Sequence, residues 1–115
     1  DMSVLEVLIE AGEALHDLSK DLTEWSNETF GDINIRGPIG PLKHLEKEAK
    51  EAQDSPHDPM EYADCLLLIL DAARRAHIKP LELIRYAQKK LEVCKTREYP
   101  KLTAENVDEP LEHLR

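Results

Sequence analysis

The sequence is short of the residues that β-rich domains need. Among its 115 residues are one Phe, one Trp and three Tyr, while 41% are hydrophobic and 34% charged. β-Sandwiches fill their cores with aromatic and β-branched side chains, so this composition favours a helical protein. The length suffices for one domain with a modest core. Residues 1–115 are therefore predicted to form a single all-α domain.

Cysteine, basic charge and long apolar runs are scarce as well. Cys65 and Cys94 lie in apolar helical runs without metal-like spacing, which predicts reduced core thiols in a cytosolic protein. The first twenty residues show no basic n-region, and the longest apolar run, 65–70, is too short to cross a bilayer. We expect a cytoplasmic protein that does not enter membranes. The net charge of −9 also argues against nucleic acid as a partner.

Apolar spacing and proline and glycine positions predict four helices. They span about Ser3 to Glu24, Pro41 to Asp54, Asp58 to His77 and Pro80 to Glu98. Residues 27–40, with three of the four glycines, are predicted to form a loop, and residues 101–115 a polar tail. The third helix is apolar all round its middle and should be the core element. Short connections favour antiparallel neighbours, which predicts a four-helix bundle-like fold.

Acidic residues are concentrated just before this core helix. Residues 46–64 hold seven carboxylates and contain Glu48 and Glu51 in an E-x-x-E pair, then Glu61 and Asp64 in an E-x-x-D pair. Residues three apart share a helix face. Taken alone, the first pair reads most simply as a solvated face, because Lys47 and Lys50 alternate with it.

The second pair, Glu61 and Asp64, is harder to explain as part of a solvated helix face. Glu61, Asp64, Leu68, Asp71 and Arg75 form one stripe, at intervals of three and four, on a helix whose other faces are apolar. A buried ionised carboxylate is costly unless it is paired or binds a metal. A salt bridge to a neighbouring helix remains the alternative for Asp64 and Asp71.

Antiparallel pairing of the second and third helices would bring both acidic pairs to one groove. Four converging carboxylates repel one another, and a hard divalent cation relieves that repulsion. Mg²⁺ or Mn²⁺ suits this set better than zinc, because no His or Cys is placed to join it. Magnesium held by carboxylates commonly takes further ligands from phosphates. The pattern therefore predicts a site for metal-bound phosphate.

The same motifs carry a family resemblance. E-x-x-E followed by E-x-x-D on consecutive helices resembles the all-α nucleoside triphosphate pyrophosphohydrolases of the MazG-like superfamily. The blocks "TFG", "RGPIGPLKHLEKEAKEA", "EYADCLLLILDAARRA", "KLEVCKTREYPK" and "DEPLEHLR" are similar to the phage-associated dATP/dGTP diphosphohydrolases, the MazZ-type branch. The similarity runs from Trp25 to the C-terminus, with its core over 25–100.

This resemblance implies an activity and a metal site. Glu48, Glu51, Glu61 and Asp64 would be the catalytic metal ligands for two or more Mg²⁺ ions, with Mn²⁺ possible. The reaction implied is hydrolysis of dGTP or dATP to the monophosphate and pyrophosphate, and we assign Glu51 as the general base. The resemblance also implies a homodimer or homotetramer, and a role in nucleotide-pool control or modified-base synthesis during phage replication.

Further substrate contacts are predicted on either side of the acidic pairs. Lys90, Lys95 and Arg97 would contact phosphate or sugar, although Lys95 also suits a helix C-terminus. Cys94 stands where the resemblance implies Asn, which has both a donor and an acceptor that a thiol lacks. Trp25, Phe30 and His44 are predicted near the nucleotide, with a structural role as the alternative for His44, and Asp71 is predicted near the nucleotide or at a subunit interface.

Two other functions remain open from the sequence. The substrate base could be cytosine, as in the dCTP pyrophosphatases of the same superfamily. Alternatively, the chain could be a non-enzymatic helical oligomerisation module whose acids bind a structural cation. Comparing turnover of the four dNTPs separates these functions.

Overall fold

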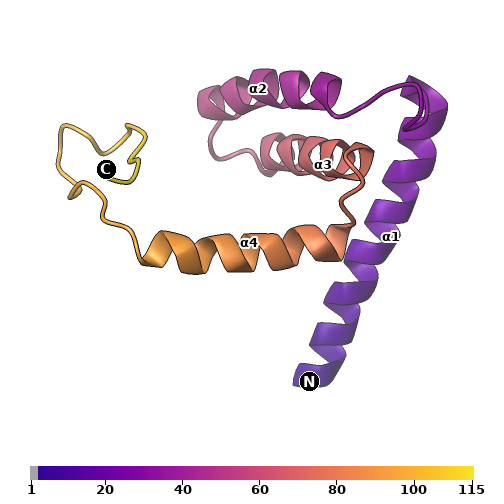
Figure 1. The fold of residues 1–115 in the computed structure, drawn as a ribbon, viewed down its shortest axis with the longest axis horizontal. Helices are drawn as coiled ribbons and strands as arrows, with labels where there is room; N and C mark the ends of the chain where they lie inside the picture. The colour runs from indigo at the N-terminus through magenta and orange to yellow at the C-terminus, as the bar shows by residue number, and fades with distance from the viewer. Residues whose placement is uncertain (1–2) are drawn as a thin grey trace. The chain divides into compact units, whose positions relative to one another are not determined.

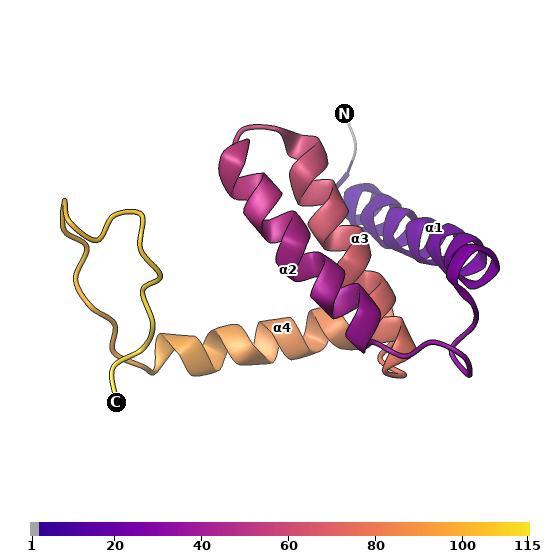
Figure 2. The ribbon, with the colours of Figure 1, turned by 90° about the horizontal axis from the view of Figure 1, so that it is seen from above.

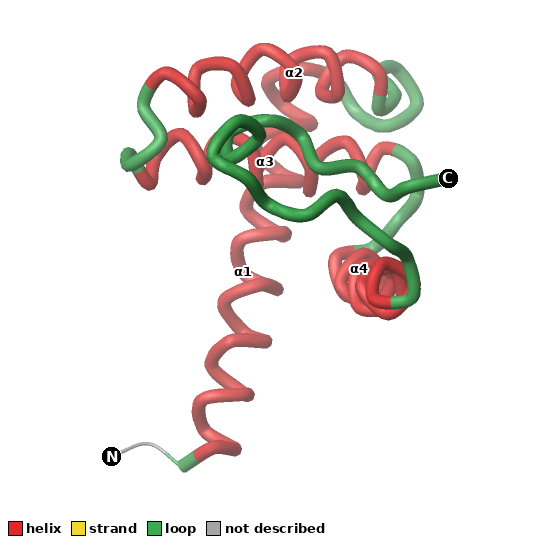
Figure 3. Tube along the Cα trace, turned by 90° about the vertical axis from the view of Figure 1, so that its left-hand side faces the viewer, coloured by secondary structure: helices red, strands yellow, loops and turns green. Residues whose placement is uncertain are grey.

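Residues 3–115, described by a computed structural model, form four α-helices and no strand. These are α1 (Val4–Phe30), α2 (Ile39–Asp54), α3 (Pro59–Arg75) and α4 (Pro80–Lys95). Figure 3 shows these helices and the loops between them. The all-α prediction is confirmed. The chain divides into one compact unit up to Pro80 and a second from Leu81 onward, and each is described by itself.

Helix α1 begins as predicted but ends later. The Ser3 hydroxyl caps its first turn by accepting a hydrogen bond from the Glu6 amide at 3.2 Å. The predicted loop start at residue 27 is wrong, because α1 continues to Phe30 and ends at Gly31, whose φ is 95°. The Asn27 side chain accepts a 2.9 Å hydrogen bond from Arg74. This tertiary contact outweighs the weak local preference of Asn for turns.

Helices α2 and α3 lie side by side and antiparallel (Figures 1 and 2). Helix α2 starts at Ile39, two residues before the predicted start, so Pro41 stands in its first turn, where a missing N–H costs nothing. Helix α3 starts as predicted, with Pro59 as its first residue and Asp58 accepting a 2.9 Å hydrogen bond from the Met60 amide. The predicted antiparallel pair is therefore present.

The core of the first unit lies where α1 meets α3, and half of its buried residues are polar. The buried residues of α1 and α3 are Leu22, Leu70, Ala72, Ser26, Asp71 and Arg75, and Pro41 of α2 is buried as well. Asp71 accepts hydrogen bonds from the Ser26 hydroxyl at 2.9 Å and from Arg75 Nε at 3.0 Å. A polar cluster thus ties α1 to α3.

Helix α3 is the core element, as predicted, but only in its C-terminal half, where Leu70, Asp71, Ala72 and Arg75 are buried. Leu66 is 52% exposed and Ile69 37% exposed, because only α1 and α2 pack on the helix within this unit. Cys65 is free and half-buried rather than enclosed. The burial on α3 is concentrated in its C-terminal half, against α1.

The N-terminal half of α1 extends beyond α2 and α3 (Figures 1 and 3). Four of its apolar side chains are more than half exposed: Val4, Leu5, Leu8 and Ile9. Val7 is 50% exposed. These apolar side chains are therefore uncovered in this single chain. No helix within residues 3–115 has the length and apolar content needed to cross a membrane.

The second unit contains most of α4 and the tail. Helix α4 ends at Lys95, three residues before the predicted end, and the Thr96 hydroxyl donates a 2.7 Å hydrogen bond to the Val93 carbonyl. Residues 101–115 form turns without helix or strand, and the Leu114 amide donates to the Glu98 carbonyl at 2.7 Å. Cys94 is half-buried and free.

Candidate metal centre

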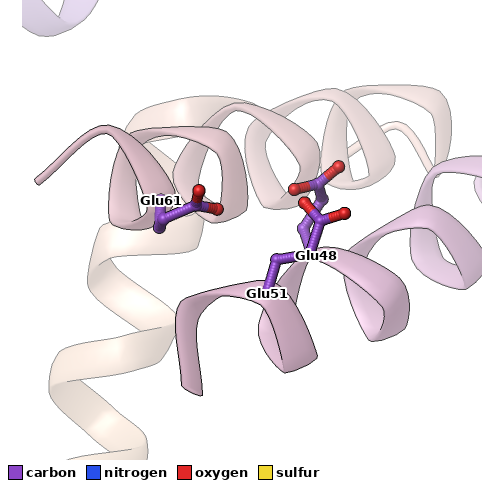
Figure 4. A group of neighbouring side chains, drawn as sticks. All are labelled: Glu48, Glu51 and Glu61. Carbon is purple, nitrogen blue, oxygen red and sulfur yellow. The ribbon is translucent and has the colours of Figure 1, made fainter. Parts of the chain in front are cut away.

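Three of the four predicted ligands meet between α2 and α3. Glu48, Glu51 and Glu61 each offer one carboxylate oxygen, and these three atoms lie within 4.8 Å of one another. Figure 4 shows Glu48 and Glu51 on α2, with Glu61 directed toward them from α3. The three-residue spacing places the first two on one side of α2, and the antiparallel pairing brings the start of α3 opposite them. The predicted convergence is therefore present for these three residues.

Two oxygens of this cluster lack the partners that buried oxygens normally have. Glu48 Oε1 lies 3.0 Å from Nε2 of His44. The second oxygen of Glu48 and one oxygen of Glu61 are buried and receive no well-formed hydrogen bond from residues 3–115. Buried oxygen atoms left in this way are costly, and a cation is the group that satisfies several at once.

The pKa values of two cluster members confirm that the carboxylates disturb one another. A side-chain hydrogen bond with Glu48 raises the pKa of Glu51, and the negative charge of Glu48 raises it further. Burial raises the pKa of Glu61, followed by the charges of Glu51, Asp64 and Asp58. Lys47 and His44 lower the pKa of Glu51 but do not cancel the rise. Without a cation, the cluster holds its negative charge at a cost.

The donor set fits a hard divalent ion. All three groups are carboxylates, which suit Mg²⁺ or Mn²⁺, while the nearest imidazole, His44, lies against Glu48 rather than completing a nitrogen-rich set. The residues at hand thus match the ion class predicted from the sequence.

Asp64 is not part of the three-residue group. It lies one turn after Glu61 on α3, its side chain is exposed, and its charge contributes to the raised pKa of Glu61. The structure thus places it beside the cluster but not within it.

The aromatic residues predicted near the nucleotide lie together at the end of α1. The rings of Trp25 and Phe30 meet edge to face with centroids 5.4 Å apart, and they are 56% and 49% exposed. Arg36 lies over Phe30, with its Cζ 5.8 Å from the ring centroid. Two accessible aromatic faces and a cation thus gather at one point.

Asp71 is occupied by contacts within the protein. Its carboxylate accepts hydrogen bonds from Arg74 Nη2 at 2.7 Å, Arg75 Nε at 3.0 Å and the Ser26 hydroxyl at 2.9 Å. Burial raises its pKa, but hydrogen bonds from Arg74, Arg75 and Ser26 outweigh that effect and the pKa lies below its usual value. These contacts favour the salt-bridge alternative, and its role toward substrate stays a prediction.

The basic residues predicted on and after α4 belong to the second unit. Lys95 donates a 3.0 Å hydrogen bond to Glu92, Lys90 is exposed, and Arg97 is half-buried. A hydrogen bond with Cys94 raises the pKa of Tyr99, with burial adding to the rise. Phosphate or sugar binding by these residues stays a prediction.

Sequence reasoning did not identify Arg36, Ser26 or Arg75 as important. Arg36 was part of a quoted block, but nothing in its local spacing distinguished it. Arg75 was the last member of the α3 stripe, and its spacing of four residues from Asp71 was the usable signal for an ion pair.

Comparisons with known proteins found a matching family model, a phage relative and a similar solved structure. A sequence model of the dATP/dGTP pyrophosphohydrolase family matches residues 18–114. The Eaa protein of Salmonella phage P22 is 48% identical over 83 residues, which make up 72% of this chain and 25% of that protein. The chain thus spans about a quarter of that relative's length.

A solved structure is similar over nearly its whole chain. It is the cyanophage S-2L MazG-like pyrophosphohydrolase bound to dGDP and three catalytic Mn²⁺ ions per active site. Its sequence is 27% identical, the TM-score is 0.64, and the match covers 88% of this chain and 97% of that chain.

Proposed function

The chain belongs to the dATP/dGTP pyrophosphohydrolase family, and from this premise we propose that it hydrolyses purine deoxynucleoside triphosphates to the monophosphate and pyrophosphate with a divalent metal ion. The family predicted from the five sequence blocks is confirmed, and the four helices form a MazG-like fold. The proposal concerns the substrate, the ion and the residues that act.

The converging carboxylates carry this proposal. Glu48, Glu51 and Glu61 come from two helices and offer oxygens within 4.8 Å of one another, and one oxygen each of Glu48 and Glu61 is buried and receives no hydrogen bond from residues 3–115. A solvated charged face would have left all of these oxygens to water. We therefore assign the three residues as metal ligands and Asp64, one turn along α3, as a fourth.

The chemistry follows from these residue types. Bound Mg²⁺ or Mn²⁺ would neutralise triphosphate charge and stabilise the charge that develops on the leaving pyrophosphate. Glu51 is the exposed member of the cluster and can be reached by solvent. In our proposal it takes the proton from the water that attacks the α-phosphorus, and the bond from that phosphorus to the bridging oxygen breaks. The products are the deoxynucleoside monophosphate and pyrophosphate.

The base would lie on the aromatic pair at the end of α1. Trp25 and Phe30 expose ring faces of the kind on which nucleobases stack. The similar cyanophage protein was solved with dGDP and Mn²⁺, which supports a purine nucleotide and a divalent ion here. His44 would contact the nucleotide from between the aromatic pair and the cluster, and Lys90, Lys95 and Arg97 would contact phosphate or sugar.

Self-association is part of the proposal. The apolar side chains of the N-terminal half of α1 are uncovered in the single chain, and a second copy would bury them. We propose a homodimer or homotetramer on this basis. Since the similar proteins come from phages, the role we propose is control of the cytoplasmic nucleotide pool, or supply of monophosphate for modified-base synthesis, during phage replication.

The test is pyrophosphate release from dGTP, dATP, dCTP and dTTP, with Mg²⁺ or Mn²⁺ and with EDTA. Glu48→Gln and Glu61→Gln should each lower kcat at least a hundredfold, on the order of the loss of one group that stabilises transition-state charge. Glu46→Gln is the matched control, because Glu46 is exposed on the same helix and lies outside the cluster.

The possible outcomes separate the alternatives. Release from dGTP or dATP that EDTA abolishes supports the proposal. Preference for dCTP keeps the chemistry and removes the purine assignment. A folded protein that binds the ion and hydrolyses none of the four nucleotides is a metal-binding module, and the proposal is then wrong.

A further inference from the structure

We infer that Arg36 selects guanine, by donating two hydrogen bonds to the O6 and N7 acceptors of the base. The inference rests on the proposed function, since it places the nucleotide phosphates at the carboxylate cluster. It adds a specificity-determining residue in the connection between α1 and α2.

Three contacts fix the position of Arg36, two through its backbone and one through its side chain. Its carbonyl accepts a 2.8 Å hydrogen bond from Nη1 of Arg75, a residue that is only 2% exposed. Its amide donates to the Asp32 carbonyl at 2.9 Å. Its guanidinium lies over the Phe30 ring, 5.8 Å from the centroid. The buried Arg75 thus fixes the backbone of Arg36, and Phe30 supports its charged end.

Gly40 makes room for the guanidinium on α2. A Cβ atom at Gly40 would lie 2.6 Å from Cζ of Arg36 and 2.8 Å from Nη1, closer than non-bonded atoms approach. The guanidinium therefore occupies the position that a side chain at residue 40 would take. Any larger residue there must displace it.

This position places Arg36 on the same side of α2 as the acidic cluster. Residues 40, 44, 48 and 51 fall within about 80° of one another around an α-helix. Gly40 precedes Glu48 by eight residues, which corresponds to a rise of about 12 Å. Along this face the order is Arg36 above Gly40, then His44, then the carboxylates. A nucleotide with its phosphates at the carboxylates can extend its base toward Arg36.

Arg36 has no acidic partner among the residues that the structure describes. The chain has 24 acidic residues and a net charge of −9, yet the half-buried Arg36 takes part in none of the ion pairs found in residues 3–115. Its guanidinium is therefore open to an acceptor from outside the chain. The neighbouring exposed rings of Trp25 and Phe30 favour a base over a phosphate as the source of that acceptor.

The chemistry of the bases then sets the preference. Guanine presents O6 and N7 as two adjacent acceptors, which match the planar fork of arginine. Adenine presents one acceptor and one donor at the same edge, and cytosine presents a donor. Arg36 therefore predicts dGTP over both dATP and dCTP.

The experiment removes the N7 acceptor and the exocyclic amino donor of guanine one at a time. Turnover of dGTP is compared with that of 7-deaza-dGTP, which lacks the N7 acceptor, and of dITP, which keeps both acceptors. Wild type should lose roughly ten- to a hundredfold in kcat/KM on dATP, the size of one bidentate base contact. Relative to dGTP, its kcat/KM should fall by a smaller factor on 7-deaza-dGTP and change little on dITP. Arg36→Gln should be nearly indifferent to the N7 deletion.

Gly40→Ala tests the position of the guanidinium without removing it. Its added methyl group should displace Arg36 and reduce the guanine preference, with KM for dGTP raised and kcat little changed. Gly37→Ala is the matched control, because a Cβ atom at Gly37 meets nothing within 4 Å. The control should retain the wild-type ratio of dGTP to dATP turnover. Melting temperatures of all variants show whether each one folds.

Binding of dGDP, dADP and 7-deaza-dGDP in the presence of Mn²⁺ provides a readout that does not depend on turnover. If wild type hydrolyses no dNTP, the proposed function is wrong, and the binding ratios still test Arg36. If Arg36→Gln retains the guanine preference, or loses all nucleotides and inorganic triphosphate equally, Arg36 does not read the base and the inference fails.

Discussion

Asp71→Asn is expected to destabilise the protein strongly, although Asp71 is far along α3 from the acidic cluster. The substitution keeps the size of the side chain and removes its charge. Asp71 accepts four hydrogen bonds: from Arg74 at 3.1 and 2.7 Å, from Arg75 at 3.0 Å and from Ser26 at 2.9 Å. An amide in its place turns an NH₂ group toward some of these donors.

The magnitude follows from the burial of the partner. The side chain of Arg75 is 0% exposed, so its guanidinium would remain buried beside a neutral group. Leaving one member of a buried ion pair uncompensated costs about 3–5 kcal/mol. Small proteins are stable by only about 5–15 kcal/mol, so this single change removes a large part of the free energy of unfolding.

Urea denaturation followed by circular dichroism measures this loss as a lower midpoint with an unchanged slope. Asp17→Asn is the control, because Asp17 is 76% exposed and surface changes usually stay within about 0.5 kcal/mol. If the two variants unfold at the same urea concentration, the buried pair does not hold α1 to α3 and our account of the core is wrong.

The pH dependence separates the charge of Asp71 from its shape. Its pKa in the folded protein lies below the reference value of 3.8, so the unfolded chain binds more protons near that pH. Its contribution is therefore present above about pH 4 and is lost as the pH falls through the lower folded value. The wild type should lose more stability than Asp71→Asn on acidification across this window.

Three other predictions concern the cluster and the helix termini. Because the folded-state pKa values of Glu51 and Glu61 are raised, the metal-free protein should lose stability as the pH rises above about 4.5, the reference value of both groups. In thermal melts, Mn²⁺ at a hundredfold excess over its Kd should raise the free energy of unfolding by about 2.7 kcal/mol and so reverse this loss. Glu61→Gln should abolish the effect of the metal, and the metal-free variant should be at least as stable as the metal-free wild type. His77→Gly should raise the free energy of unfolding by roughly 0.5–1 kcal/mol in urea melts. The reason is that His77 holds a φ of 64° at the end of α3, where its amide donates to the Arg74 carbonyl at 2.9 Å. A loss of stability would contradict this. Leu5→Glu combined with Leu8→Glu should lower the mass measured by light scattering, since both side chains are more than 60% exposed in the single chain. The control Glu6→Gln should leave the mass unchanged. An unchanged mass in the double variant would exclude this face of α1 as the contact between copies of the chain.

The acidic pairs could be predicted because their geometry is local. Glu48 and Glu51 share a face of α2 by spacing alone, and the short connection to α3 brings Glu61 opposite them. Helix starts at Ser3 and Pro59 were also predictable, since a cap and a first-turn proline act within one turn. Features set by neighbours within a few residues were thus available from the sequence.

Features set by tertiary contacts were not available. Asn27 is a turn-prone residue type that precedes a glycine-rich stretch, yet residues 27–30 remain helical where Asn27 accepts a hydrogen bond from Arg74 of α3. The position of Arg36 depends on Gly40 and on the buried Arg75, which lies 39 residues further along the chain. No local pattern contains that information, because each contact exists only once α1, α2 and α3 are packed together.

The stripe along α3 shows why spacing alone could not assign a role to each acid. Glu61 and Asp71 belong to one helical repeat and are the same kind of group, yet their pKa values shift in opposite directions. At the start of α3, Glu61 faces two further carboxylates from α2, so burial and repulsion favour its protonated form. At the other end, Asp71 faces Ser26 of α1 and is flanked by Arg74 and Arg75, which favour its ionised form. The charged neighbours of each carboxylate, and not the repeat itself, decide whether it needs an external cation or is neutralised within the fold: Asp71 has Arg74 and Arg75 of its own helix, whereas the charges that raise the pKa of Glu61 are all carboxylates. A cation at the first end and the ion pair at the second are therefore independent, and substitutions at Glu61 and Asp71 should have additive effects on stability.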